Sequence, residues 1–236
     1  MLPIDAPDLR GLSPEQRAAM RAAGQEVQAC YRALEKAGLN VVGEALKGQG
    51  DFVEMEHHPR DGVFDAETRS QYYYHAHRGG DLEHGHFHAF LRAGGMPAGV
   101  APLDDPRASE PWPRGDDAIC HLVAIAIDAW GYPIDLFCVN RWVTDKTWYP
   151  AEAVIAMLDR FAVDHAFPNW AVNRWLTALL RLYRPHVEAL IRHRDRTIAA
   201  WRQAHPDRDV FADRTLEITG YLPIAVEDLL AQLDTL

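Results

Sequence analysis

The sequence predicts an α+β fold in which an antiparallel sheet of about five strands packs against helices from both ends of the chain. The prediction rests on a change of periodicity. Residues 51–142 contain stretches of alternating apolar and polar side chains, whereas residues 13–47 and 151–236 carry apolar side chains at the helical repeat. Because one face of such a sheet needs covering, we expect the 236 residues to form a single α+β domain.

The N-terminal part begins with a helix-start signal. Ser13 is followed by Pro14, Glu15 and Gln16, which is typical of a capped first turn and predicts a helix over 14–37. A shorter helix is expected over 41–46. The alternation in 51–58 then predicts a strand that ends at His58-Pro59.

Two hairpins make up the rest of the predicted sheet. The first covers 70–91, and the second covers 119–142 with a turn around Gly131. Between them, residues 94–117 are rich in Gly, Pro and Asp and predict a long irregular connection, which is either a lid or a surface excursion.

The C-terminal part is predicted to be helical. We expect helices over 151–163 and 169–205, and a short terminal helix over 225–236. Pro185 should kink or break the long helix, because proline cannot donate a backbone hydrogen bond.

Composition excludes several classes of function. The net charge of −10 argues against nucleic-acid binding, which needs basic side chains to replace phosphate counterions. Without a long apolar run or a secretory signal at its start, the chain is expected in the cytoplasm and not in a membrane. The three cysteines lack the spacing of a disulfide framework or a zinc knuckle, so we expect reduced, buried thiols.

Five of the twelve histidines fall within fourteen residues and point to a metal site on the first hairpin. They are His75, His77, His84, His86 and His88. Alternate residues of a strand share a face, so each strand would present its histidines on one side.

With a hairpin turn at Gly79-Gly80 and a connection of two or four residues, His75 would face His84, His77 would face Leu82 and Tyr73 would face His86. All five imidazoles would then converge. A three-residue connection would place the two histidine sets on opposite faces.

Imidazole suits zinc, copper, iron and nickel, so the predicted cofactor is a divalent transition metal: iron, copper or zinc. The five histidines form the pool of ligands, of which only some can bind one ion if a position stays open for chemistry. Glu83 could be a ligand, a general base or a group that orients a histidine. A buried, hydrogen-bonded histidine network without metal is the structural alternative.

Three further residues are candidates around this site. Tyr73 could contact a substrate from the histidine face. Arg141 could bind a substrate carboxylate, although a structural ion pair is its more common use. His121 is expected to be a core histidine that shares a face with Val123, Ile125 and Ile127.

Two resemblances accompany these motifs. The runs Tyr-Tyr-Tyr-His-Ala-His-Arg, Glu-His-Gly-His-Phe-His and Asn-Arg-Trp-Val-Thr look like those of an uncharacterised bacterial family of unknown function, over much of 50–200. Residues 75–88 are also similar to the metal motif of the cupins. Here, however, five residues separate His77 from Glu83, which is more than the cupin motif normally has. A second glycine-bounded cupin motif does not follow.

The sequence therefore favours a metal-dependent oxidoreductase that uses iron or copper and acts on a small molecule. A zinc-dependent hydrolase, a non-catalytic metal- or haem-binding protein and a partner-binding protein with a histidine network are the alternatives. The aromatic long helix also leaves room for a homodimer.

Overall fold

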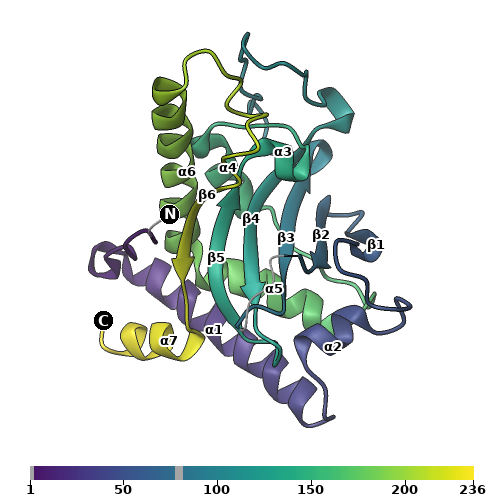
Figure 1. Cartoon of the computed structure of the whole chain (residues 1–236). Helices are drawn as coiled ribbons and strands as arrows, with labels where there is room; N and C mark the ends of the chain where they lie inside the picture. Colours follow the sequence, from purple (N-terminus) through teal and green to yellow (C-terminus); the bar gives the residue numbers. More distant parts are fainter. Residues whose placement is uncertain (1–2, 78–81) are drawn as a thin grey trace.

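The structure is a computed structural model that describes residues 3–77 and 82–236. Six antiparallel strands form one sheet, and each strand pairs with its neighbour in the chain (Figure 1). The strands are β1 (His58–Phe64), β2 (Ser70–His75), β3 (Gly85–Arg92), β4 (Ile119–Ile127), β5 (Pro133–Val139) and β6 (Ile218–Pro223). The predicted α+β class is confirmed.

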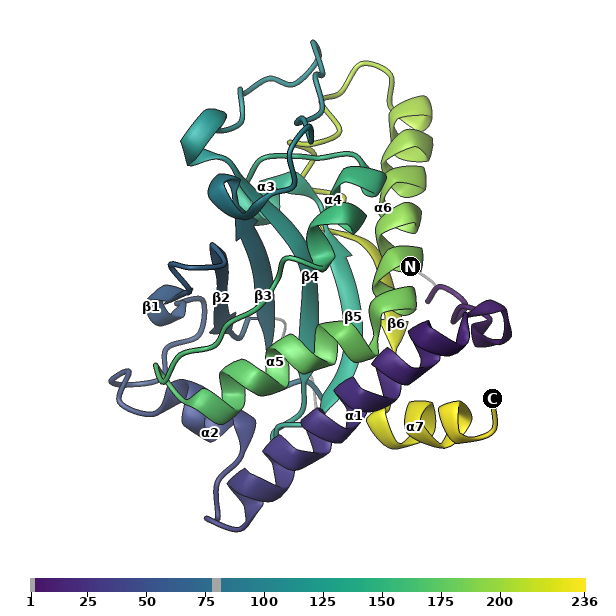
Figure 2. The same ribbon diagram turned by 180° about the vertical axis from the view of Figure 1, so that it is seen from behind.

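Helices cover one face of this sheet. They are α1 (Pro14–Glu35), α2 (Val41–Leu46), α4 (Ala151–Leu158), α5 (Trp170–Leu182), α6 (Arg184–Ala204) and α7 (Val226–Asp234). The short helix α3 (Arg141–Thr144) lies on the opposite face, where Val143 packs against Ala124 and Phe137. Short 3-10 turns are present at Leu9–Gly11, Ala93–Gly95 and Gly115–Asp117. Figure 2 shows α1 and α5 crossing the back of the sheet, while α6 stands beside β5 and β6. Among the described residues, no helix combines the length and apolar character that a bilayer span requires.

The main core lies between the sheet and these helices. Tyr72 and Phe87 point to this side, and the Phe87 ring lies 5.7 Å from that of Trp175 in α5. All three side chains are fully buried. We call this side the core face and the opposite side the histidine face; Figure 1 shows the sheet from its histidine face.

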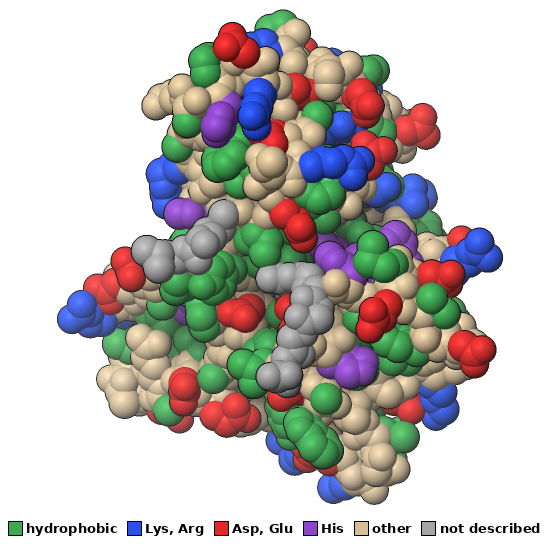
Figure 3. Space-filling view, in the orientation of Figure 1, with side chains coloured by type: hydrophobic (Ala, Val, Ile, Leu, Met, Phe, Trp, Pro, Cys, Tyr) green, Lys and Arg blue, Asp and Glu red, His purple; other side chains and the backbone are tan. Residues whose placement is uncertain are grey.

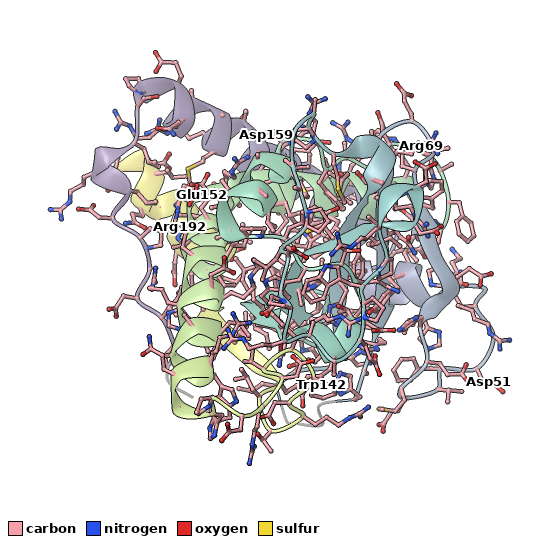
Figure 4. All side chains as sticks on the ribbon, turned by 90° about the horizontal axis from the view of Figure 1, so that it is seen from above. Asp51, Arg69, Trp142, Glu152, Asp159 and Arg192 are labelled. Carbon is pink, nitrogen blue, oxygen red and sulfur yellow. The ribbon has the colours of Figure 1, made fainter. Side chains whose placement is uncertain are left out.

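Helix α6 is fixed to the rest of the fold by polar contacts as well. Arg192 donates to Glu152 of α4 over 2.8 Å, and the two side chains meet at the edge of the molecule seen in Figure 4. Farther along α6, Ile198 packs in a second cluster with Trp112 and Phe211, which anchors the connection 94–117 to this end of the molecule.

Several predicted boundaries are confirmed. Ser13 and Gln16 form the expected capping box at the start of α1, and α2 covers the predicted residues. The long C-terminal helix breaks at Tyr183, so that Pro185 lies in the first turn of α6, where its missing N–H has no helical partner to lose.

One prediction about the sheet is wrong, and one strand was not predicted. The first strand covers His58–Phe64, not 51–58: His58-Pro59 opens a strand because Pro59 lies on the edge of the sheet, where its missing donor breaks no ladder. Strand β6 was not predicted, because its six residues include Gly220 and Pro223 and show no clear alternation. With β6 the sheet has six strands, in agreement with the predicted antiparallel sheet of about five.

Candidate metal centre

The register of β2 and β3 determines which histidines meet. His75 lies opposite His86, and Tyr73 lies opposite His88. The predicted pairs of His75 with His84 and Tyr73 with His86 are therefore wrong by two residues. A shift by two keeps the same faces together, so the imidazoles of both strands still share the histidine face. The predicted turn at Gly79-Gly80 lies outside the described residues.

Three of the five histidines form a group that could hold a metal ion. One ring nitrogen each of His75, His77 and His86 lies within 4.8 Å of the others. The ring centroid of His75 lies 4.5 Å from that of His86 and 4.7 Å from that of His77. His75 and His86 are buried and His77 is half-buried.

The hydrogen bonding of His75 supports a cation at this position. The residue is 8% exposed, and among the described residues neither of its ring nitrogens has a hydrogen-bond partner. Burying such nitrogens unpaired is costly. In a tetrahedral site with metal–nitrogen bonds of about 2.0–2.1 Å the ligand nitrogens lie roughly 3.3 Å apart, so small rotations of the rings would complete a site.

Glu83 is tied to one member of this three-histidine group. Its Oε1 accepts a hydrogen bond of 2.6 Å from Nδ1 of His86. With the proton held at Nδ1, the lone pair of His86 lies on Nε2, where a metal can use it. Of the three roles considered for Glu83, the geometry matches that of an orienting carboxylate.

His88 and His121 form a separate pair beside the group. His88 is 1% exposed, and its Nδ1 lies 3.0 Å from Nε2 of His121. The expectation that His121 shares a face with Val123 is wrong. The ladder is irregular between Ala89 and Phe90, so that Phe90 pairs with His121 while Ala89 pairs with Val123, and the offset turns His121 to the histidine face.

His84 lies apart from the group. Its Nδ1 is 2.6 Å from the hydroxyl of Tyr74, and its ring lies 5.6 Å from that of Phe52. Tyr74 belongs to the core face. His84 comes directly before β3, so the alternation of that strand does not direct its ring.

Burial keeps three imidazoles of this face neutral, those of His75, His88 and His121. It lowers the pKa of His75 to about 2, with the neighbouring His86 and His77 adding to the effect. Burial also lowers the pKa of His121 to about 3 and that of His88 well below its usual value. Neutral imidazole is the form that binds metals.

Tyr73 lies next to the group on the histidine face. Its ring stacks on His57 at 3.7 Å and lies 5.4 Å from the ring of His75. Burial raises the pKa of the Tyr73 phenol, so the phenol stays protonated at neutral pH.

Arg141 lies outside the three-histidine group. It begins α3, pairs with Asp145 over 2.9 Å and lines a small cavity with His121. The structural ion pair considered for Arg141 is therefore present.

A cleft opens beside the three-histidine group. His77 lines it together with Trp201, Glu217 and Ile218, and its volume is about 810 Å³. Figure 3 shows histidine side chains on this face of the molecule, beside β1 and β2. A metal at the group would therefore have one side toward a space that can admit a small molecule.

Two residues of this face, Ala126 and Asp135, were not predicted to belong to it. In the row of the sheet that contains His75 and His86, Ala126 and Asp135 follow on β4 and β5. Ala126 is fully buried in a small cluster with Ala124, Phe137 and Val139, and the Phe137 ring lies 5.2 Å from that of His86. The alternation of Ala124 and Ala126 with Val123, Ile125 and Ile127 was the available signal: it marks one face of β4 as built from small residues.

The chain matches one protein family. A family model described as a domain of unknown function, DUF6969, matches residues 21–224. Neither the curated proteins nor the solved structures gave a significant match.

Proposed function

We propose that this chain, which belongs to the family of the domain of unknown function DUF6969, is a metal-dependent enzyme whose His75, His77 and His86 bind one transition-metal ion. The observation that carries the proposal is the convergence of three imidazoles around His75, whose buried ring nitrogens lack partners among the described residues. A metal ion would satisfy that ring and unite the three side chains.

An enzyme fits this geometry better than a storage or delivery protein. Three protein ligands leave at least one coordination position open, as in catalytic sites, whereas closed structural sites use four. The half-buried His77 lines the cleft, so the open position would be accessible to a small substrate.

We further propose that the reaction is an oxidation or reduction supported by iron or copper. Imidazole is a good ligand for both metals. Zinc-dependent hydrolysis often uses a nearby carboxylate as general base. Oε1 of Glu83 instead accepts a hydrogen bond from Nδ1 of His86, which supports a role in orienting that histidine.

Elemental analysis of protein purified without an affinity tag tests this function. We expect about one equivalent of iron or copper in the wild type, almost none in the His75→Ala/His86→Ala double variant, and the wild-type content in His205→Ala, which changes a histidine outside the group. One equivalent of zinc would replace the redox proposal by hydrolysis. Metal content that is unchanged in the double variant would refute the site.

A further inference from the structure

A second site lies on the histidine face, beside the three-histidine group. A groove of about 160 Å³ is lined by Tyr73 and Phe90 and by the basic side chains of Arg60, Arg92 and Lys146. We call it the Lys146 groove. Among its described lining residues the acidic side chain is the exposed Asp61, so basic side chains prevail in a protein whose net charge is −10.

Lys146 has an unusual environment for a lysine of this chain. The chain has three lysines; Lys36 and Lys47 are exposed, and Lys47 pairs with Glu44 over 3.1 Å. Lys146 is half-buried and forms no ion pair among the described residues. Because withdrawing an ammonium group from water without a counter-charge is unfavourable, this position favours an anion.

A small cavity continues the basic region on the other side of Lys146. It shares Lys146 and Thr144 with the groove and is also lined by Arg141 and Arg194. Both arginines are more than nine-tenths buried and each pairs with a carboxylate, Arg141 with Asp145 over 2.9 Å and Arg194 with Asp195 over 2.7 Å. Even so, Nε of Arg141 has no hydrogen-bond partner among the described residues. A buried guanidinium donor without an acceptor is the second, independent sign that an anion belongs here.

The groove adjoins the three-histidine group through Tyr73. The ring of this tyrosine lies in the groove, 5.4 Å from the ring of His75 and 5.2 Å from that of His88. The ring of His57 also lines the groove, stacks on Tyr73 and lies 5.4 Å from the ring of His75. The stacked rings of Tyr73 and His57 therefore join the groove to the three-histidine group.

We propose that Lys146, assisted by Arg92 and Arg60, binds the oxyanion of the substrate, a carboxylate or a phosphate group. The role as substrate anchor rests on the proposed metal-dependent function, whereas anion binding at the groove does not. Lysine and arginine are the side chains that recognise such groups, and the narrow groove would hold one of them while the rest of the molecule reaches the histidines.

Calorimetric titration of the metal-free full chain tests the anion site. Inorganic phosphate and acetate are the probes, at constant ionic strength, with the wild type, Lys146→Met and Lys36→Met; the last removes the same charge at an exposed position. We expect saturable binding to the wild type and Lys36→Met, and at least tenfold weaker binding to Lys146→Met. Tighter binding of phosphate or of acetate identifies the preferred group. Equal binding by all three proteins, or no saturable binding of either probe, would overturn the proposal.

A second measurement needs no variant. Acetylation of each lysine in the wild type is followed by mass spectrometry with and without the preferred probe, so Lys36 and Lys47 serve as internal controls. We expect the probe to slow the reaction of Lys146 at least threefold relative to both; equal protection of all three lysines would count against the site. Metal binding is measured in the same samples. If the wild type binds the anion but no metal ion, Lys146 has no role as substrate anchor of a metal-dependent enzyme, and the anion site remains in place.

Discussion

His75 and His86 face each other across the β2–β3 ladder, with ring centroids 4.5 Å apart and ring planes at 88°. The backbone register alone fixes this relationship, because directly opposed residues of antiparallel strands project from the same face. His77 joins them from the end of β2. The proposed metal chemistry of this chain depends on that pair.

The carboxylate of Glu83 should tune the metal affinity of the group. We expect Glu83→Gln to weaken metal binding about tenfold to hundredfold, because the hydrogen bond that orients His86 loses its charge. Metal affinity is measured by competition with a chelator. Glu56→Gln, which neutralises an exposed carboxylate, is the control and should bind like the wild type. Equal affinities in both variants would show that Glu83 does not act through His86.

His84 should be dispensable for metal binding, although it belongs to the same sequence cluster. We expect His84→Ala to keep its metal affinity within about threefold of the wild type, because its ring contacts Tyr74 and Phe52 outside the three-histidine group. His75→Ala, assayed in parallel by the same competition, should lose most of its affinity. A loss in His84→Ala as large as in His75→Ala would contradict this assignment.

Gly85 should be essential for the stability of the hairpin. A Cβ atom at this position would lie 2.5 Å from the hydroxyl of Tyr74 and 2.7 Å from the carbonyl oxygen of His75. We expect Gly85→Ala to lower the free energy of unfolding in urea by about 1–3 kcal/mol. Gly11→Ala is the matched control, since a Cβ there meets nothing within 4 Å, and it should change stability by less than about 0.5 kcal/mol. Similar stabilities of the two variants would refute the steric argument.

His186 should make the fold sensitive to acid. Burial lowers its pKa to about 4, below its ordinary value of 6.5. The unfolded chain therefore takes up a proton at higher pH than the folded chain. The stabilisation is complete above about pH 6.5 and is lost as the pH falls toward 4, by up to about 3 kcal/mol.

The pH dependence of urea unfolding checks this effect. His186→Leu should lose less stability than the wild type between pH 6.5 and 4, because the substituted side chain has no proton to take up. The remaining dependence in the variant includes the other buried histidines, such as His88 and His121. Parallel curves for the two proteins would contradict a buried, neutral His186.

The sequence predicted the parts of this fold that local patterns determine. The capping box at Ser13 and the break before Pro185 follow from rules that span a few residues. The shared face of His75 and His86 was expected only for a connection of two or four residues. The exact partner of His75 does not, because the length of the connection sets the register. The face of His121 depends on an irregularity of the β3–β4 ladder, which alternation within β4 cannot reveal.

The Lys146 groove was also beyond reach of the sequence. Its lining side chains come from β1, β2, β3, β4, α3 and the residues that flank them, which only the folded sheet brings together. Arg141 was the basic residue that the sequence suggested as a substrate contact. The structure places it in the adjoining small cavity, on the other side of Lys146.

Titration of the metal-free protein with Co(II), followed by visible absorption, tests the central claim most directly. We expect the wild type and His205→Ala to bind one equivalent with the bands of a nitrogen-ligated cobalt centre, and His75→Ala and His86→Ala to bind at least a hundredfold more weakly. Binding of Co(II) by both of these variants with wild-type affinity and the same spectrum would contradict a metal centre at His75, His77 and His86.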